Sequence, residues 1–394
     1  MPEVFKPMSQ ANVFEQIIKH ISRKEFERSV SKHCGDRKVR QLDCWTWFGS
    51  LLFGQLTGHD SIRAIERVFC HGNSRMQRLG FSTVCRSTLS DANRTRPLQI
   101  LEDTYKSILK VAREVGPKKH RLQFDGDVLA LDSSTISLCL SLSPWANYRR
   151  QTAAAKLHTA IDLASDLPNM FVVTRAKCND IPVARKHFQF TPGSTVVFDR
   201  GYWDSSWFNL LTSQNVFWVT RVRKNNRFKL VKSNPVDRTL GHICDQIVYQ
   251  ISRRGRPKYK GKLRRISYKD PETGKRLTFI TNHFDLATQI ICDLYKSRWN
   301  VELFFKTLKQ NLRVKKFLGN SEHAVKAQIY VALIAYVLVK LVRWLAKSRI
   351  SLPDAMAAIG TLLLLREPLL SLFGELPRNT RHPPSSQMLL PINF

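Results

Sequence analysis

One stretch near residue 300 constrains the fold more than any other, because its polar and its apolar residues both follow helical spacing. Tyr295 is followed by Arg298, Glu302 and Lys309 at +3, +7 and +14. At about 100° per residue, these four side chains fall within an arc of roughly 60°. A neighbouring arc holds the apolar residues Ile290, Leu294, Val301, Phe305, Leu308 and Leu312. We predict one helix that packs by its apolar arc and presents a hydroxyl, two cations and a carboxylate beside it.

The chain carries far more positive than negative charge. Its 394 residues include 63 Lys and Arg against 31 Asp and Glu, a net charge of +32. Such a chain attracts polyanions, most commonly nucleic acid, although a basic surface can also serve solubility. The length predicts two or three domains, and a hydrophobic content of 43% is enough for a sizeable core.

Neither the cysteines nor the apolar segments indicate zinc, secretion or a membrane span. The eight cysteines contain no Cys-x-x-Cys pair, so we expect reduced cysteines and no zinc site. The first residues lack a secretory pattern. The longest uncharged apolar stretch, 327–339, is too short to span a bilayer and predicts a buried core helix. We expect a cytoplasmic protein with no membrane partner.

Residues 1–124 predict a helical N-terminal domain. Helical spacing of apolar residues and the position of Pro97 predict helices at 14–21, 42–56, 61–69 and 87–96. Because Lys and Arg outnumber Asp and Glu here, DNA binding is the expected role, and helical packing or dimerisation is the alternative.

Residues 125–221 predict a different architecture, in which strands alternate with helices. Strand-like runs lie at 128–131, 157–163, 170–174, 195–198 and 216–220, and helical segments at 176–190 and 205–213. This order describes a mixed α/β sheet flanked by helices. We assign 285–347, which contains the Glu302 helix and the apolar core helix, to the same catalytic domain.

A basic segment, 222–284, interrupts that domain. It contains 17 Lys and Arg against four Asp and Glu, and short strand-like runs lie at 228–231, 247–251 and 277–280. We predict a β-rich insertion that contacts phosphate, with a solvated linker as the alternative. The C-terminal segment, 348–394, ends in Pro-rich sequence, and its role is open.

Three acidic residues are candidates for chemistry. Asp132 and Asp199 each directly follow an apolar strand run, and Glu302 lies on a helix that could cover the sheet. Three carboxylates from separate elements can share two Mg²⁺ ions, which prefer oxygen ligands and can drive in-line displacement at a phosphate. The other aspartates that compete for these roles are Asp125, Asp127, Asp162 and Asp204.

These residues together resemble a known family. Tyr-x2-Arg-x3-Glu-x6-Lys is similar to the signature of bacterial insertion-sequence transposases of the DDE type, in the insertion-sequence-four group. The positions that match it are Tyr295, Arg298, Glu302 and Lys309. Asp132 in Leu-Ala-Leu-Asp-Ser-Ser and Asp199 in Val-Val-Phe-Asp-Arg-Gly-Tyr resemble the two aspartates of that family. The resemblance covers residues 125 to about 345.

The resemblance implies a fold, a metal site and a reaction. The fold is ribonuclease H-like, and the site holds two Mg²⁺ ions, with Mn²⁺ able to substitute. The implied metal ligands are Asp132, Asp199 and Glu302. The implied DNA contacts are Tyr295, Arg298 and Lys309. The protein would cleave double-stranded DNA at inverted-repeat ends and transfer the 3′-hydroxyl ends to target DNA, as a homodimer in a bacterial cytoplasm.

One feature departs from the family pattern. Some relatives hold a flipped base on a tryptophan of the insertion, and residues 222–284 contain no Trp. Stacking could fall to Trp218, to Trp299 or to an insertion Tyr or Phe, since any aromatic face can stack a base.

Two other functions remain open from sequence. One is a ribonuclease H-like nuclease that cuts without joining. The other is a DNA-binding protein that has no catalysis.

Overall fold

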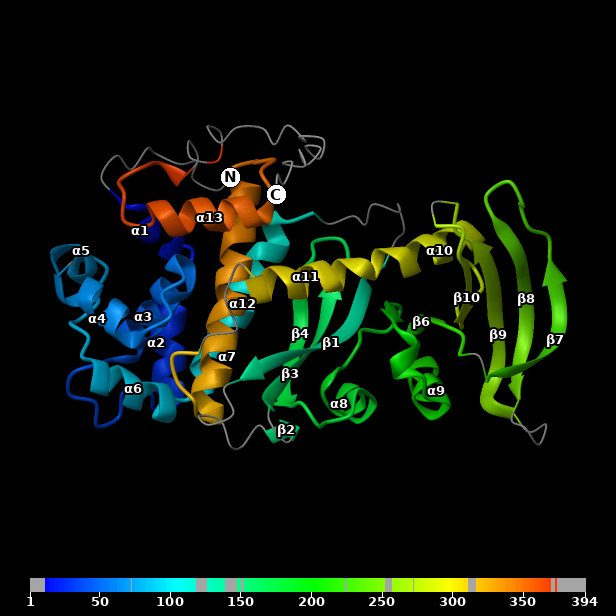
Figure 1. Cartoon of the computed structure of the whole chain (residues 1–394), viewed down its shortest axis with the longest axis horizontal. Helices are drawn as coiled ribbons and strands as arrows, with labels where there is room; N and C mark the ends of the chain where they lie inside the picture. The colour runs from blue at the N-terminus through cyan, green and yellow to red at the C-terminus, as the bar shows by residue number, and fades with distance from the viewer. Residues whose placement is uncertain are drawn as a thin grey trace, which may run out of the picture.

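The computed structural model describes residues 11–71, 73–117, 126–138, 147–149, 152–223, 225–251, 257–271, 273–310, 317–369 and 373. Within this part of the chain, one ten-stranded mixed sheet extends from a group of helices (Figure 1). This group, which contains the N-terminal helices, lies at one end of the molecule, and strand β7 lies at the other. The Pro-rich end of the sequence and Asp125 lie outside the described residues.

Seven helices lie between residues 13 and 115 of the described chain. They are α1 (Val13–Ile18), α2 (Arg23–Lys32), α3 (Cys44–Thr57), α4 (Ile62–His71), α5 (Asn73–Arg78), α6 (Arg86–Thr95) and α7 (Leu98–Val115). Local chemistry sets several starts: the side chains of Asn12, Ser22 and Asp43 each accept a hydrogen bond from a backbone N–H of the first turn that follows. Helix α3 is buried along almost its whole length, as expected for a helix that is apolar all round.

The sheet contains all ten strands. They are β1 (Val128–Leu138), β2 (Asn147–Arg149), β3 (Thr152–Asp162), β4 (Leu167–Arg175), β5 (Thr195–Phe198), β6 (Phe217–Arg221), β7 (Arg227–Asn234), β8 (His242–Ile251), β9 (Pro257–Lys269) and β10 (Arg276–Thr281). Nine of them follow the order β2-β3-β1-β5-β6-β10-β9-β8-β7, and β4 pairs with β3. Strands β1, β5 and β6 are parallel, and the pairs on either side are antiparallel.

Helices cover both faces of the sheet. Alternation along β1 sends Ala130 into the core shared with α10 (Thr288–Ser297), α11 (Trp299–Gln310) and α12 (Glu322–Leu345). Leu131 points to the opposite face, into a second core shared with α8 (Asp180–His187) and α9 (Ser205–Ser213). The mixed α/β architecture predicted for this region is therefore present.

The basic insertion continues the sheet rather than interrupting it. Strand β10 pairs with β6, and β9, β8 and β7 follow outward in turn. The sequence predicted three strands here and missed β9, the longest strand described. Figure 1 shows these strands as an extension beyond β6.

The predicted single helix around residue 300 is divided in two. Helix α10 ends at Ser297, Arg298 follows as its C-cap, and α11 begins at Trp299. At the junction the backbone N–H of Arg298 donates to Tyr295 and that of Val301 donates to Arg298, which is the tighter i to i−3 pattern. The two helices still run end to end (Figure 1). Of the predicted apolar arc, Leu294, Val301, Phe305 and Leu308 are buried and Ile290 is partly buried, while Leu312 lies outside the described residues.

Helix α12 joins the N-terminal helices to the sheet. It packs against α3, α6, α7 and α13 (Leu352–Leu362), and its residues belong to the same core as α10 and α11. By length and composition it could cross a membrane, but 89% of its most apolar window is buried inside the protein. It is the core helix that the sequence predicted.

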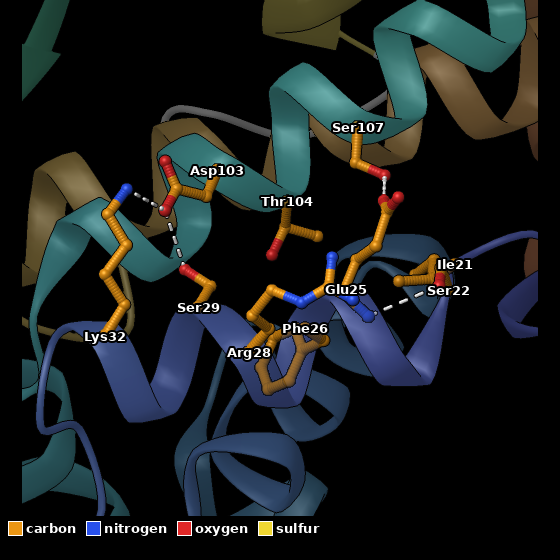
Figure 2. A pocket seen from close by; sticks show the side chains of 10 residues that line it. All are labelled: Ile21, Ser22, Glu25, Phe26, Arg28, Ser29, Lys32, Asp103, Thr104 and Ser107. Atoms are coloured by element: carbon orange, nitrogen blue, oxygen red, sulfur yellow. Dashed lines mark hydrogen bonds and ion pairs between the residues drawn. The ribbon is translucent and has the colours of Figure 1, made fainter.

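A shallow groove lies between α2 and α7 (Figure 2). Its polar groups already bind one another: the Asp103 carboxylate accepts from the Ser29 hydroxyl and the Lys32 ammonium, and Ser107 donates to Glu25. This groove is explained by helix packing.

Candidate active site

Strand register places two of the predicted acidic residues side by side. Strands β1 and β5 are parallel neighbours, and Leu131 lies opposite Phe198. Asp132 and Asp199 are the next residues along each chain segment. Because side chains alternate between faces, both project on the side of Ala130 and Val197, which is the face covered by α10 and α11.

The two aspartates differ in their local backbone. Asp199 follows the end of β5, as predicted, and its Oδ1 accepts from the Gly201 N–H at 2.7 Å, which caps the short 3-10 helix η2 (Arg200–Tyr202). Asp132 does not end a strand, contrary to the prediction. Strand β1 continues through it to Leu138 because β3 pairs with this whole segment.

Glu302 reaches the same place from α11 through Arg298. The Arg298 guanidinium donates from Nη1 to Asp132 Oδ2 at 3.2 Å and from Nη2 to Glu302 Oε1 at 2.9 Å. The Arg298 side chain is only 13% exposed, so this bridge is shielded from water. Three carboxylates predicted from separate sequence segments are thus brought to one face of the sheet.

The charges of this group act on one another. Burial is the main cause that raises the pKa of the Asp132 carboxyl to about 6, and the negative charges of Asp199 and Glu302 act in the same direction. The Ser133 backbone N–H, 2.7 Å from Asp132 Oδ1, and the Arg298 guanidinium lower the pKa. A carboxyl under this repulsion favours a neighbouring cation.

The donor atoms suit a divalent metal ion, whereas their present arrangement suits an arginine. Carboxylate oxygens are the ligands that Mg²⁺ prefers. Among the described residues, however, no three His, Cys, Asp or Glu side chains form a ready set of metal ligands. The guanidinium of Arg298 joins Asp132 to Glu302 instead.

The other predicted DNA contacts also have protein partners. Tyr295 is buried at 9% exposure, with its ring centroid 4.8 Å from that of Phe279. The Lys309 ammonium donates to the Ser134 hydroxyl at 2.7 Å. Lys309 therefore lies on the carboxylate-bearing face of β1, while Tyr295 helps to pack α10 onto the sheet.

The competing aspartates within the described residues have local roles. Asp162 accepts from the Ala164 N–H at 2.9 Å and the Ser165 hydroxyl at 2.6 Å in the turn after β3. Asp204 caps α9 by accepting from the Trp207 N–H at 2.8 Å. Asp127 is exposed just before β1. Asp199 also caps a short helix, but it directly follows the strand that pairs with β1 and so lies beside Asp132.

A polar cluster around Ser133, on the face of β1 opposite to the Asp132 side chain, was not predicted from sequence. Asp180, the first residue of α8, accepts from the Ser133 hydroxyl at 2.8 Å and from the Lys156 ammonium at 3.2 Å. The buried His158 lies 3.3 Å from the same carboxylate oxygen. The one sequence signal is that Ser133 follows Asp132, since strand pairing and helix placement bring in the rest.

The aromatic residues considered for base stacking differ sharply in exposure. Trp218, Tyr259, Tyr268 and Phe279 are buried, Phe228 and Tyr249 are half-buried, and Phe284 and Trp299 are 42% and 57% exposed. Of the two exposed rings, that of Trp299 belongs to the residue next to Arg298 in the chain.

A basic α/β chain with three carboxylates gathered on its sheet has the character of an enzyme that acts on nucleic acid. Residues 123–338, more than half of the chain, match the family described as "Transposase DDE domain". The chain belongs to this family of DNA-cutting and DNA-joining enzymes. Residues 9–82 match a second family, described as "Domain of unknown function (DUF4372)".

Relatives that are named as transposases align with about two thirds of this chain. A protein of Sinorhizobium fredii, named as the candidate transposase y4zB, is 30% identical over 67% of this chain and 73% of its own length. One from Geobacillus stearothermophilus, named for insertion sequence element IS5377, is 30% identical over 70% of this chain and 71% of its own. One from Synechocystis, named for element IS4SA, is 26% identical over 66% and 72%.

One of the solved structures that match this chain does so at low similarity. It is a piggyBac transposase synaptic complex with hairpin DNA, 13% identical, with a TM-score of 0.41 over 96% of this chain and 84% of that one. A likeness at this level says nothing about the function of this chain.

Proposed function

We propose that this transposase cleaves DNA at the inverted-repeat ends of its mobile element and transfers the 3′-hydroxyl ends to target DNA. The observation that carries the proposal is the convergence of Asp132, Asp199 and Glu302 on one face of the sheet. Three carboxylates from three elements suit two-metal-ion phosphoryl transfer and require no protein nucleophile.

The metal ligands in this proposal are the same three carboxylates. The family generally implies divalent metal ions. Two Mg²⁺ ions, or Mn²⁺ in their place, would activate a water or a 3′-hydroxyl and stabilise the leaving oxygen when bound. Strand β1 holds Asp132 on backbone paired with β3, and Asp199 directly follows β5. The Ser133 N–H fixes the Asp132 carboxylate.

Cationic side chains around the carboxylates would hold the DNA backbone. Arg298 and Lys309 can neutralise phosphates, and the Tyr295 hydroxyl could donate to one after a local rearrangement that exposes it. Trp299, which is exposed and follows Arg298 in the chain, would stack a base. The exposed cations of the insertion, such as Arg227, extend this basic surface along the sheet.

The division into domains belongs to the same proposal. Residues 125–221 and 285–347 would form the ribonuclease H-like catalytic domain of an insertion-sequence-four member. Residues 222–284 would be its basic insertion. Residues 1–124 would contact DNA, and 348–394 would form a C-terminal segment. The enzyme would act in the bacterial cytoplasm as a homodimer that pairs two transposon ends.

Purified protein and its native flanking DNA test the chemistry. Asp132→Ala, Asp199→Ala and Glu302→Ala should each reduce Mg²⁺-dependent strand cleavage by more than about a hundredfold, because each removes a metal ligand. Binding to the same DNA should persist. Asp204→Ala is the matched control, since it removes a helix cap outside the site. Cleavage retained by Glu302→Ala would contradict the proposal.

The products of the same reaction separate the alternatives. A nuclease without strand transfer would cut the DNA and leave no joined product. A protein that only binds would shift the DNA equally with and without metal and never cut it. Joined products that depend on all three carboxylates distinguish the transposase from both.

A further inference from the structure

Arg298 occupies the space between two of the proposed metal ligands. Its two terminal nitrogens each donate to a different carboxylate, 3.2 Å from Asp132 and 2.9 Å from Glu302. Asp132 Oδ1 already accepts from the Ser133 N–H, so both oxygens of this carboxylate have protein donors. A positive group therefore already lies where a metal ion would bind.

The guanidinium and a divalent ion cannot both occupy the space between these carboxylates without a large electrostatic cost. Both are cations, and repulsion between charges a few ångströms apart is strong when water is largely excluded. The Arg298 side chain is 13% exposed, so screening by solvent is weak here. Loading of the metal thus requires the guanidinium to leave at least one carboxylate.

The present arrangement also leaves Arg298 incompletely bonded. Its Nε is buried and has no hydrogen-bond partner, although guanidinium carries five N–H donors. Arg298 lies at the junction of α10 and α11, where the backbone is already irregular. A DNA phosphate offers a bidentate partner that suits guanidinium at least as well as two separate carboxylates do.

We propose that Arg298 closes the metal site in the DNA-free protein and that a DNA phosphate opens it by drawing the guanidinium away from Asp132 and Glu302. The inference rests on the proposed function, because it assumes that these carboxylates bind metal. Metal and DNA would then each strengthen binding of the other by the same factor. A divalent ion would be held firmly only after DNA is in place.

Mn²⁺ binding to the full-length protein, measured from the electron paramagnetic resonance signal of free Mn²⁺, tests this without any turnover. Without DNA, Arg298→Ala should bind Mn²⁺ about tenfold more tightly than wild type. Arg298→Lys, which can pair with only one carboxylate, should fall between them and covers the case in which the alanine variant folds poorly. Lys306→Ala is the charge control, because Lys306 is exposed on the same helix outside these contacts.

In a second experiment, Mn²⁺ binding is measured in the presence of a random-sequence DNA duplex. The amount of Mn²⁺ that the DNA binds by itself is subtracted. The duplex should tighten Mn²⁺ binding to wild type and add little to Arg298→Ala. Equal affinity of wild type and Arg298→Ala without DNA, or an affinity gain in Lys306→Ala equal to that in Arg298→Ala, would overturn the inference. Glu302→Ala separates the two failures: if it loses Mn²⁺ binding, the metal site stands and only the role of Arg298 is wrong. If Glu302→Ala binds Mn²⁺ with the affinity of wild type, the carboxylates do not form a metal site and the proposed function fails here.

Discussion

Lys309 and Arg298 lie on one predicted helical arc but have partners of different kinds. Arg298 binds two carboxylates, whereas Lys309 donates to the neutral hydroxyl of Ser134. Lys309 carries its cation on the carboxylate-bearing face of β1, so it is a candidate for binding a phosphate beside Asp132.

Lys309→Ala should weaken binding to duplex DNA and reduce its salt dependence. Removing one ion pair with a phosphate lowers the slope of log affinity against log salt by about one. Titrations at several salt concentrations measure this slope. Lys347→Ala, an exposed lysine just after α12, serves as the control. An unchanged slope in Lys309→Ala, or the same change in both variants, would exclude Lys309 from the DNA-binding surface.

Residue identity, spacing and the family resemblance made Asp132, Asp199 and Glu302 the candidate carboxylates, but the guanidinium bridge could not be predicted. Asp199 follows its strand as expected, and helical spacing placed Glu302 beside Arg298. The pairing of Arg298 with Asp132 joins residues 166 positions apart. Local sequence carries no information on such a pairing until strand register and helix packing are fixed.

Among the secondary-structure elements, β8, β9 and α10 are tied together by a buried ion pair. Arg264 Nη2 lies 2.6 Å from Asp245 Oδ2, and both side chains are buried. Arg264 also donates to the carbonyls of Phe284 and Leu286, and Asp245 accepts from the Thr288 hydroxyl at 2.9 Å. This network fixes the start of α10, the helix that leads to Arg298.

Asp245→Ala should destabilise the protein by about 3 kcal/mol or more, because it leaves the Arg264 charge buried without its partner. Urea denaturation measures the destabilisation. The double variant Asp245→Leu with Arg264→Met should recover most of the stability, since replacing both charges by apolar groups removes the unpaired cation. A destabilisation below about 1 kcal/mol in the single variant would show that water reaches Arg264 and that the network is weak.

The same pair explains why β9 escaped prediction. Its sequence, Lys258-Tyr-Lys-Gly-Lys-Leu-Arg-Arg-Ile-Ser-Tyr-Lys, is dense in cations and follows an Arg-Gly-Arg-Pro turn signal. The apolar residues Tyr259, Leu263 and Ile266 are buried, and Arg264 joins them only because Asp245 neutralises it from the next strand. Strand pairing across the sheet overrides the local preference for loop.

The molecule as a whole depends on α12, which links the helical end to the sheet. Its Lys340 is buried and donates to the Ser165 carbonyl at 2.6 Å in the turn between β3 and β4. The 1–124 helices share one core with α12, so this part of the chain and residues 285–347 fold against each other. The sequence predicted α1, α3, α4, α6 and the apolar helix α12 but missed α2, α5 and α7. It did not predict this shared core either, because the core joins segments that lie far apart in the chain.

Lys340 should make stability depend on pH. Burial lowers its pKa from 10.5 to about 8, so between these values the native state releases a proton that the unfolded chain retains. Stability must then rise with pH across this window, and the burial cost is fully present below about pH 8. Compared with Lys340→Met, wild type should gain about 2 kcal/mol between about pH 7 and pH 9.5, measured by urea denaturation. A constant difference across that range would contradict the lowered pKa.

The central claim is that Asp132, Asp199 and Glu302 form one catalytic centre for transposition. The most direct measurement is a mobility assay on a plasmid that carries this gene with its native flanking DNA, in which wild type is compared with Glu302→Ala and all junctions are sequenced. We predict excision and new insertions with wild type and none with Glu302→Ala at equal protein levels. Movement that persists in Glu302→Ala, or no movement with wild type despite intact DNA binding, would contradict the claim.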